Sequence, residues 1–420
     1  PAMIIQRPRY MEKLIRGMGS GQVKIVTGVR RCGKSFLLFD LFKSHLVGQG
    51  VPESNIFEMA FDRFSSRKYR DPEVFYPYLT ERLEGVAGAR YVLLDEVQLL
   101  GDFAEVLIDL IAMEGVDVYV TGGNAKLLSK DVVTEFRGRG QEIAMAPLSF
   151  SEFMSAYDGG KHDGYREYAT YGGLPGIFAR ETPEEKADYL NSLYKEVYLR
   201  DIVERNDVRD SGNLEELVDV LSSAIGSLTN ASKLAATFKS RKGARMAPET
   251  VERYLSFLED SFLLRRAKRY DVKGRRYIST PFKFYFADLG LRNARMNFRQ
   301  MKETHIMENV VYNELVGRGL GVDVGVVPVS TKDEDGKSQR VQLEIDFVCN
   351  RGSKRYYVQS AFALPTSEKR DQEQRPLLKV DDGFKKVIVT KEGLEPHYNE
   401  NGILMMNVYD FLLNQDSLDF

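Results

Sequence analysis

The first third of the chain alternates short apolar runs with segments of helical periodicity. Tyr91–Leu94 and Val116–Val120 have the apolar character of strands that are covered on both faces, and Val23–Thr27 reads as a third strand. Lys34–Leu46 and Phe103–Met113 have apolar residues at helical spacing. Strands that alternate with helices predict an α/β fold in which a parallel sheet lies between two helical layers.

After Pro147 the pattern becomes mainly helical as far as Asp210, with an interruption at Gly172–Pro175. Three short helical segments and two strand-like runs follow, and their order predicts a winged helix-turn-helix. The helical segments are Leu214–Gly226, Ala231–Thr237 and Thr250–Phe257, and the strand-like runs are Leu263–Tyr270 and Arg276–Ser279.

The last third resumes an α/β pattern. A long helix is expected at Thr304–Val316, and Thr331–Arg340 is polar enough to form a mobile hairpin tip. The strands expected around it are Val322–Val329, Val341–Val348, Tyr356–Gln359 and Val387–Thr390. We therefore expect four domains: a parallel-sheet core at 3–148, a lid-like helical extension at 149–210, a winged helix at 211–293 and a second α/β domain at 294–420.

Composition supports an ordinary globular protein of several domains. The chain has 420 residues, of which 43% are hydrophobic and 29% are charged. No apolar run approaches the roughly 18 residues that span a bilayer, and Met3–Arg7 lacks the apolar core of a signal peptide. The cysteines are Cys32 and Cys349, which indicates no disulfide framework. We expect a cytoplasmic protein with no membrane association.

Charge is distributed unevenly along the chain. The whole chain has a net charge of −2, but the segment from Lys233 to Arg276 contains 13 Lys or Arg and 5 Asp or Glu residues, a net charge of +8. A basic block in a neutral chain is typical of a surface that contacts nucleic-acid phosphates. The predicted DNA contacts are Lys239, Arg241, Lys242, Arg245, Arg253, Lys273, Arg275 and Arg276.

Gly28–Ser35 matches the phosphate-binding pattern GxxxxGK[ST] and lies between a predicted strand and a predicted helix. Glycines let the backbone curl around phosphates, so that successive N–H groups and the helix N-terminus face the anion. Lys34 is expected to reach the β- and γ-phosphates of ATP, and Ser35 to bind Mg²⁺. The predicted nucleotide contacts are Gly28, Val29, Arg30, Arg31, Cys32, Gly33, Lys34, Ser35 and Phe36.

Asp95 and Glu96 follow the apolar strand Tyr91–Leu94 and predict the acidic half of the same site. Asp95 would hold Mg²⁺ through water, and Glu96 would orient and activate the attacking water. The pair is specific only in combination with the phosphate-binding loop.

Several motifs resemble those of prokaryotic AAA+-superfamily P-loop ATPases that carry a C-terminal region of the DUF4143 type, with a winged helix and a restriction-endonuclease-like part. The resemblance covers almost the whole chain. The motifs are Tyr91–Gln98, Thr121–Ser129, Phe136–Arg139, Pro147–Phe153, Tyr171–Pro175, Tyr198–Arg205, Asp288–Leu291 and Glu344–Phe347.

The resemblance implies further site residues in the ATPase part. Asn124 would be the sensor that hydrogen-bonds the γ-phosphate or the attacking water. Arg139, with Arg137 as second choice, would stabilise γ-phosphate charge in cis or from a neighbouring chain, and a surface ion pair is the alternative. The resemblance also implies that Pro175, Arg7 and Tyr10 contact the base, although Gly172–Pro175 is equally consistent with a simple helix break.

In the C-terminal third, the order of Glu308, Asp346 and Gln359 resembles a nuclease core that holds Mg²⁺ between carboxylates and uses a lysine to activate water. The last motif departs from that pattern, because Gln359–Ala361 replaces the second acid with an amide and the lysine with alanine. Lys354 or Lys369 could supply a lysine from elsewhere. We expect a degenerate, catalytically silent nuclease-like site.

These observations predict an ATP- and Mg²⁺-dependent ATPase that acts as a conformational switch and is coupled to DNA. Three alternatives remain: a non-hydrolysing regulator gated by nucleotide, an ATPase that acts on a protein partner, and an ATP-gated nuclease. An arginine that acts from a neighbouring chain would require an oligomer.

Overall fold

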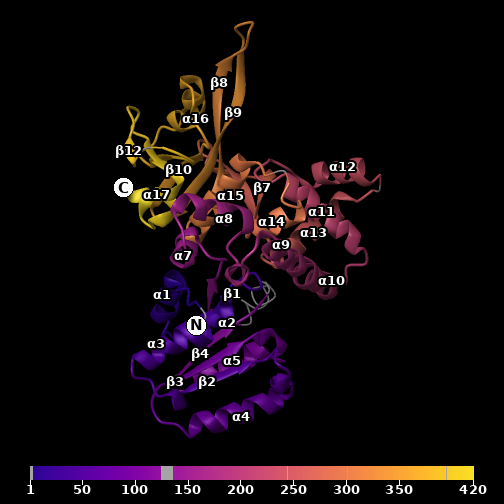
Figure 1. Cartoon of the computed structure of the whole chain (residues 1–420), viewed down its shortest axis with the longest axis vertical. Coiled ribbons are helices and arrows are strands. Elements are labelled where there is room, and N and C mark those ends of the chain that lie inside the picture. Colours follow the sequence, from indigo (N-terminus) through magenta and orange to yellow (C-terminus); the bar gives the residue numbers. More distant parts are fainter. Residues whose placement is uncertain (1–2, 124–135, 244, 300, 394) are drawn as a thin grey trace. The chain divides into compact units, whose positions relative to one another are not determined.

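The computed structural model describes residues 3–123, 136–243, 245–299, 301–393 and 395–420 (Figure 1). The chain forms two compact units. The N-terminal unit contains residues 1–147 together with 174–176 and 260–262, and the C-terminal unit contains 148–173, 177–259 and 263–420. The long continuous segment of the first unit ends at Pro147, next to the end predicted for the ATPase core at 148, whereas the three other predicted domains fall mostly in the second unit.

The sheet of the N-terminal unit has five parallel strands in the order β2-β3-β4-β1-β5. This is the parallel sheet that the alternating pattern predicts. The strands are β1 (Val23–Thr27), β2 (Ile56–Ala60), β3 (Arg90–Asp95), β4 (Val116–Thr121) and β5 (Gly140–Ala144). Sequence periodicity located β1, β3 and β4 but not β2 or β5, because the latter two mix polar with apolar residues and are partly exposed at the two sheet edges.

Helices cover both faces of this sheet (Figure 1). Residues that alternate along the strands, such as Ile25, Val92 and Val118, pack against α4 and α5 in one apolar core. On the other face, the ring of Phe42 lies 4.3 Å from the ring of Tyr119. The helices are α1 (Pro8–Arg16), α2 (Lys34–Phe36), a π-helical stretch (Leu37–Phe42), α3 (Lys43–Gly48), α4 (Pro72–Glu84) and α5 (Phe103–Ala112).

The C-terminal unit begins with helices and continues into a large mixed sheet. Its helices are α7 (Phe150–Ala156), α8 (Lys161–Tyr171), α9 (Pro183–Ser192), α10 (Arg200–Asn206), α11 (Ser211–Ser223), α12 (Ala231–Lys242), α13 (Pro248–Asp260), α14 (Leu289–Arg295), α15 (Glu303–Gly317), α16 (Ser367–Leu378) and α17 (Val408–Leu413). A π-helical stretch (Leu193–Leu199) joins α9 to α10.

The mixed sheet has eight strands in the order β12-β13-β11-β10-β9-β8-β6-β7. Strands β10, β11 and β13 are parallel to one another, and β9 is antiparallel to both β8 and β10. The strands are β6 (Leu264–Asp271), β7 (Arg276–Phe286), β8 (Gly321–Lys332), β9 (Ser338–Arg351), β10 (Lys354–Ser360), β11 (Lys385–Thr390), β12 (His397–Tyr398) and β13 (Leu404–Asn407).

The predicted winged helix is not confirmed, although its elements occur in the expected order. Helices α11, α12 and α13 precede the antiparallel hairpin of β6 and β7. Strand β6 also pairs in parallel with β8, from Arg269 opposite Val324 to Asp271 opposite Val326. The hairpin is therefore part of the eight-stranded sheet and not a separate wing.

Two predicted boundaries need correction. Helix α12 extends to Lys242, so Lys239 and Arg241 lie on its last turns and not in a loop. The polar tip at 331–340 is a hairpin as predicted, but β8 and β9 remain paired to Lys332 opposite Ser338, which gives a long two-stranded ribbon (Figure 1).

None of the described helices combines the length and apolar character needed to cross a bilayer.

Candidate functional site

The phosphate-binding loop follows β1 at the carboxyl edge of the parallel sheet, where ligands of α/β folds usually bind. Gly28 has φ 144° and Gly33 has φ 103°, values that disfavour residues with a side chain. A Cβ atom on Gly28 would also lie only 2.1 Å from the carbonyl oxygen of Met145. The shape of the loop therefore requires both glycines of the motif.

Lys34 is the first residue of α2 and is 6% exposed. Its ammonium donates hydrogen bonds to the carbonyl oxygens of Gly28 at 3.0 Å and Val29 at 3.1 Å. The cation therefore spans the inside of the loop that would surround a phosphate. Phosphate oxygens are stronger acceptors for an ammonium than neutral carbonyls are, so an anion in the loop would compete for these donors.

Asp95, at the end of β3, joins the two halves of the predicted site. Ser35 donates a hydrogen bond of 2.7 Å to Oδ2 of Asp95, and the hydroxyl of Thr121 donates to Oδ1. The backbone N–H of Glu96 donates to the same Thr121 hydroxyl at 3.0 Å. Because β4 lies between β1 and β3, its last residue Thr121 is placed beside both motifs. Thr121 was not identified as a separate site residue from the sequence, although it begins the motif Thr121–Ser129.

Glu96 has a backbone conformation that is unusual for a residue with a side chain. Its φ is 53°, in the left-handed region, and its carboxylate accepts a hydrogen bond from the side-chain amide of Gln98. Backbone strain of this kind is concentrated at functional sites. Oε2 of Glu96 lies 3.3 Å from the position that a Cβ atom on Gly123 would occupy. The carboxylate therefore approaches the segment that follows β4.

Arg7 and Tyr10 are buried beside the loop. The guanidinium of Arg7, 2% exposed, donates to the carbonyl oxygens of Cys32 at 2.9 Å and Ala146 at 2.6 Å. The hydroxyl of Tyr10 accepts a hydrogen bond of 3.0 Å from the N–H of Ala146. These contacts tie the loop to the segment after β5. Pro175 is near the loop too, since its Cγ lies 3.8 Å from the position of a Cβ atom on Gly33. Contact of these three residues with a base stays a prediction.

The structure places the two candidate arginines away from the loop of the same chain. The carbonyl oxygen of Arg139 accepts a hydrogen bond of 2.7 Å from the N–H of Val23, the first residue of β1. The loop follows Thr27 at the other end of that strand, about 13 Å away at roughly 3.3 Å per residue. Arg137 and Arg139 line a hollow of about 590 Å³ beside the start of α5. Stabilisation of γ-phosphate charge by either arginine at the loop of its own chain is therefore unfavourable. Stabilisation at the loop of a neighbouring chain stays a prediction. Asn124 lies outside the described residues.

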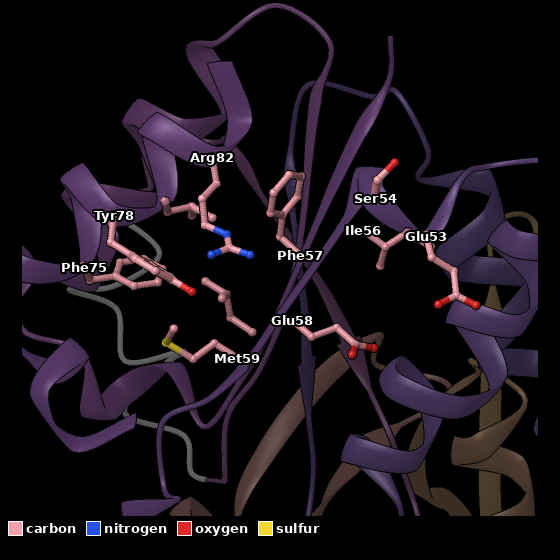
Figure 2. Close-up of a pocket in the computed structure, with 11 residues that line it drawn as sticks. Glu53, Ser54, Ile56, Phe57, Glu58, Met59, Phe75, Tyr78 and Arg82 are labelled. Atoms are coloured by element: carbon pink, nitrogen blue, oxygen red, sulfur yellow. The ribbon is translucent and has the colours of Figure 1, made fainter. Parts of the chain in front are cut away.

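A second hollow in the N-terminal unit, of about 200 Å³, lies around the edge strand β2 and α4 (Figure 2). Phe57, Met59, Phe75 and Tyr78 supply apolar and aromatic side chains, and the side chain of Arg82 lies beside Phe57. It shares no residue with the phosphate-binding loop. We therefore do not assign it to nucleotide binding.

Two of the motifs quoted from the sequence have a structural explanation. Oδ1 of Asp288 accepts from the N–H of Gly173 at 2.8 Å, and Oδ2 accepts from the N–H of Leu291 at 3.1 Å. Gly172 has φ 78°, and a Cβ atom there would lie 2.4 Å from Asp288. The motifs Tyr171–Pro175 and Asp288–Leu291 thus hold α8 and α14 together.

The predicted basic and nuclease-like residues also lie in this unit. Seven of the predicted DNA contacts are exposed: Lys239, Arg241, Arg245, Arg253, Lys273, Arg275 and Arg276; the side chain of Lys242 lies outside the described part. Gln359 accepts a hydrogen bond of 2.7 Å from the N–H of Asp346. Burial, followed by repulsion from Glu308, raises the pKa of Asp346 well above its ordinary value. The structure therefore places Gln359 and Glu308 near Asp346, but the predicted nuclease-like domain is not confirmed.

Comparisons with known proteins identify the N-terminal part. Residues 20–154 match the model of an AAA domain, and residues 162–302 match a domain of unknown function, DUF8612. The predicted region of the DUF4143 type is not confirmed. Among solved structures, the Aeropyrum pernix ORC1 protein in complex with DNA has 14% identity and a TM-score of 0.29, covering 71% of this chain and 94% of that chain. The Saccharomyces cerevisiae Hsp104–ADP complex has 12% identity and a TM-score of 0.32, covering 75% and 42%.

Two proteins described only as uncharacterised are similar over nearly the full length. One from Methanocaldococcus jannaschii is 23% identical over 410 residues, covering 93% of this chain and 85% of that protein. One from Haemophilus influenzae is 32% identical over 415 residues, covering 98% of this chain and 99% of that protein. The N-terminal part of this chain is an AAA domain. The chain as a whole belongs to the same family as the Haemophilus influenzae protein.

Proposed function

We propose that the chain binds Mg-ATP at the carboxyl edge of the N-terminal sheet and hydrolyses it. The observation that carries the proposal is the continuous set of contacts from Ser35 through Asp95 and Thr121 to the backbone of Glu96. These contacts link a hydroxyl and a carboxylate of the kind that bind Mg²⁺ to the backbone of Glu96, whose carboxylate would act as the base. The AAA domain at residues 20–154 supports the same function.

Each residue has a chemical role in this proposal. Ser35 would bind Mg²⁺ directly and Asp95 would hold it through water, and the ion would neutralise charge on the β- and γ-phosphates. Lys34 moves from the carbonyls of Gly28 and Val29 to the phosphates. Glu96 orients a water for attack on the γ-phosphate and accepts its proton. Thr121 holds Asp95 and the backbone of Glu96 in a fixed relation.

Steady-state ATP hydrolysis by wild type and Glu96→Gln tests the proposal. We expect the variant to bind ATP with nearly unchanged affinity and to turn over about 100-fold more slowly, the scale of losing a general base. Glu58→Gln is the matched control, because Glu58 is an exposed glutamate on β2 whose carboxylate pairs with Lys43 at 3.2 Å. Equal turnover by wild type and Glu96→Gln would remove Glu96 from the mechanism. ATP binding without turnover in either protein would favour a nucleotide-gated regulator.

A second function, in which the ATPase switch is coupled to DNA, rests on the exposed basic residues of the C-terminal unit. Lys273, Arg275 and Arg276 are exposed at the turn between β6 and β7. Arg276 lies 3.9 Å from Asp271, with 77% of its own side chain exposed, so this ion pair is loose. Such side chains contribute affinity for phosphates and salt dependence but little sequence recognition.

The DNA proposal is tested by the affinity of the full chain for duplex DNA at several salt concentrations. Replacing Lys273, Arg275 and Arg276 with Ala should weaken binding and make the slope of log affinity against log salt less negative by about 2 to 3, since each lost phosphate contact changes it by about 0.9. Arg370, Arg375 and Lys379, which are exposed on or beside α16, are the matched triple control. Equal effects from both triple variants would indicate non-specific attraction, and no binding by wild type would direct the search to protein partners.

A further inference from the structure

A buried lysine occupies the centre of the acidic cluster in the C-terminal unit. The ammonium of Lys283 lies 2.6 Å from Oε1 of Glu344 and 3.2 Å from Oε1 of Glu308. The hydroxyl of Tyr285 donates a hydrogen bond of 2.6 Å to the same oxygen of Glu308. Lys283 is 3% exposed and Glu308 is 7% exposed. We call Lys283, Tyr285, Glu308, Glu344 and Asp346 the Lys283 cluster.

The strands and one helix explain how these side chains meet. Lys283 and Tyr285 are two residues apart on β7, and Glu344 and Asp346 are two residues apart on β9, so that each pair lies on one face of its strand. Glu308 projects from α15, which packs against β7. The sequence offers Lys354 and Lys369 as sources of a lysine and does not point to Lys283, because β7 precedes all the motifs that suggest a nuclease-like core.

The cluster does not fit the metal site that a nuclease-like core implies. Glu308 lies on α15, Asp346 on β9 and Gln359 on β10. Yet the side-chain oxygen of Gln359 accepts from the N–H of Asp346 at 2.7 Å, and its amide nitrogen donates to the carbonyl of Glu373 at 3.2 Å. In the described part of the chain, no group of three or more His, Cys, Asp or Glu side chains is arranged to hold a metal ion.

Charge balance favours the lysine over a metal ion. A divalent ion between Glu308, Glu344 and Asp346 would lie next to a buried ammonium, and two cations in a poorly solvated site repel each other strongly. The attraction of Glu308, Asp346 and Glu344 outweighs the burial of Lys283 and raises the pKa of its ammonium. The contacts of 3.2 Å with Glu308 and 2.6 Å with Glu344 place the ammonium where it compensates these two carboxylates.

We propose that Lys283 is the permanent internal cation of this carboxylate cluster, so that the C-terminal unit binds no divalent ion there and does not cleave nucleic acid by metal-dependent hydrolysis. The ammonium takes the position that a metal ion would need. Glu344, whose side chain is 36% exposed, marks the side from which an ion could enter once the ammonium is removed.

The test is the number of Mn²⁺ ions bound by the full, nucleotide-free chain, measured by electron paramagnetic resonance. Wild type and Asp346→Asn should bind the same number, because any ion held by Ser35 and Asp95 is common to both. Lys283→Met should bind one more ion, and the double variant Lys283→Met/Asp346→Asn should lose it again. Lys283→Arg, which keeps the positive charge, should behave as wild type.

Two results overturn the proposal: a Mn²⁺ site in wild type that Asp346→Asn removes, or a folded Lys283→Met that gains no site. If Lys283→Met does not fold, the comparison of wild type with Asp346→Asn still tests the proposal. Equal numbers of bound Mn²⁺ ions support it, and a smaller number in Asp346→Asn overturns it. Supercoiled plasmid incubated with wild type and Mn²⁺ should stay intact. Cleavage that Asp346→Asn abolishes would show that Lys283 serves a metal-dependent nuclease.

Discussion

The hydroxyl of Ser35 lies 2.7 Å from Oδ2 of Asp95, although 60 residues separate the two in the chain. The contact links the start of α2 to the end of β3, and it requires the intervening strand β4 to lie between β1 and β3. Two oxygen groups of the kind that Mg²⁺ prefers are thus preorganised on rigid elements. The gain in nucleotide affinity that Mg²⁺ provides should therefore depend on this pair.

Ser35→Ala removes the hydroxyl and leaves the loop backbone unchanged. We expect ATP affinity in the presence of Mg²⁺ to fall by about 10-fold or more, the scale of one charge-assisted contact, while affinity in EDTA changes little. Calorimetric titrations with Mg²⁺ and with EDTA measure both. Ser44→Ala, at an exposed serine of α3, is the control. An equal loss of affinity under the two conditions would mean that Ser35 contacts phosphate or shapes the loop and does not bind the metal ion.

Thr121→Val keeps the shape of a buried side chain and removes its hydroxyl. Thr121 is 0% exposed, and its hydroxyl donates to Asp95 and accepts from the N–H of Glu96. Without it Glu96 is less well positioned, so kcat should fall by about 10-fold, equivalent to about 1.4 kcal/mol. ATP affinity should remain within about 3-fold, because Thr121 contacts no nucleotide in the proposed site. Thr121→Ser should restore kcat, and a failure of this rescue would argue against the hydroxyl as the cause.

The site shows what periodicity and motifs can predict. Asp95 and Ser35 were located because each belongs to a local pattern, a buried strand followed by acids and a glycine-rich loop followed by a helix. The apolar strands β1, β3 and β4 were recognised for the same local reason. Edge strands β2 and β5 were missed, since exposed edges carry mixed residues that resemble loops.

Other features depend on long-range pairing, which a single sequence does not reveal. The β6–β7 hairpin was expected to be a free wing, but β6 pairs with β8 more than 50 residues later in the chain. Lys283 was not considered as a partner of Glu308 because only the sheet and α15 bring them together. The register between β1 and β5 likewise decides that Arg139 lies far from the loop of its own chain.

That position of Arg139 predicts that fast hydrolysis requires more than one chain. If Arg139 stabilises γ-phosphate charge, it does so at the loop of a neighbouring chain, and turnover per chain should rise with protein concentration. Mixing Arg139→Ala with Glu96→Gln should give more activity than either variant alone, because one mixed interface contains an intact Glu96 and an intact arginine. Turnover that is independent of concentration, with no recovery on mixing, would assign Arg139 to the surface. Arg137 is tested in the same way.

Arg7→Met separates a structural role of Arg7 from contact with the base. The guanidinium of Arg7 satisfies the carbonyls of Cys32 and Ala146, which the variant leaves buried without this donor. We expect the variant to lose about 1 to 3 kcal/mol of stability, measured as a lower midpoint of thermal unfolding. Its affinities for ATP and for inorganic triphosphate should fall by the same factor. A loss confined to ATP would support the predicted contact between Arg7 and the base.

Asp346 gives the C-terminal unit a definite pH dependence. Burial and the nearby Glu308 raise the pKa of Asp346 well above its ordinary value of 3.8, despite the opposing charge of Lys283. Because the folded-state pKa exceeds the unfolded one, the folded chain binds more protons between the two values. The stability contributed by protonated Asp346 is therefore fully present below about pH 3.8 and is lost as the pH rises through the folded-state pKa.

Asp346→Asn tests this dependence, because an amide resembles the protonated acid and cannot titrate. The midpoint of thermal unfolding of the variant should match that of wild type at acidic pH and exceed it increasingly as the pH rises toward 8. Asp335→Asn, at an exposed aspartate of the β8–β9 turn, should show no such trend. A difference between wild type and Asp346→Asn that stays constant with pH would mean that Asp346 is already ionised across the range. Lys283 would then compensate its charge fully, and the elevated pKa would not hold.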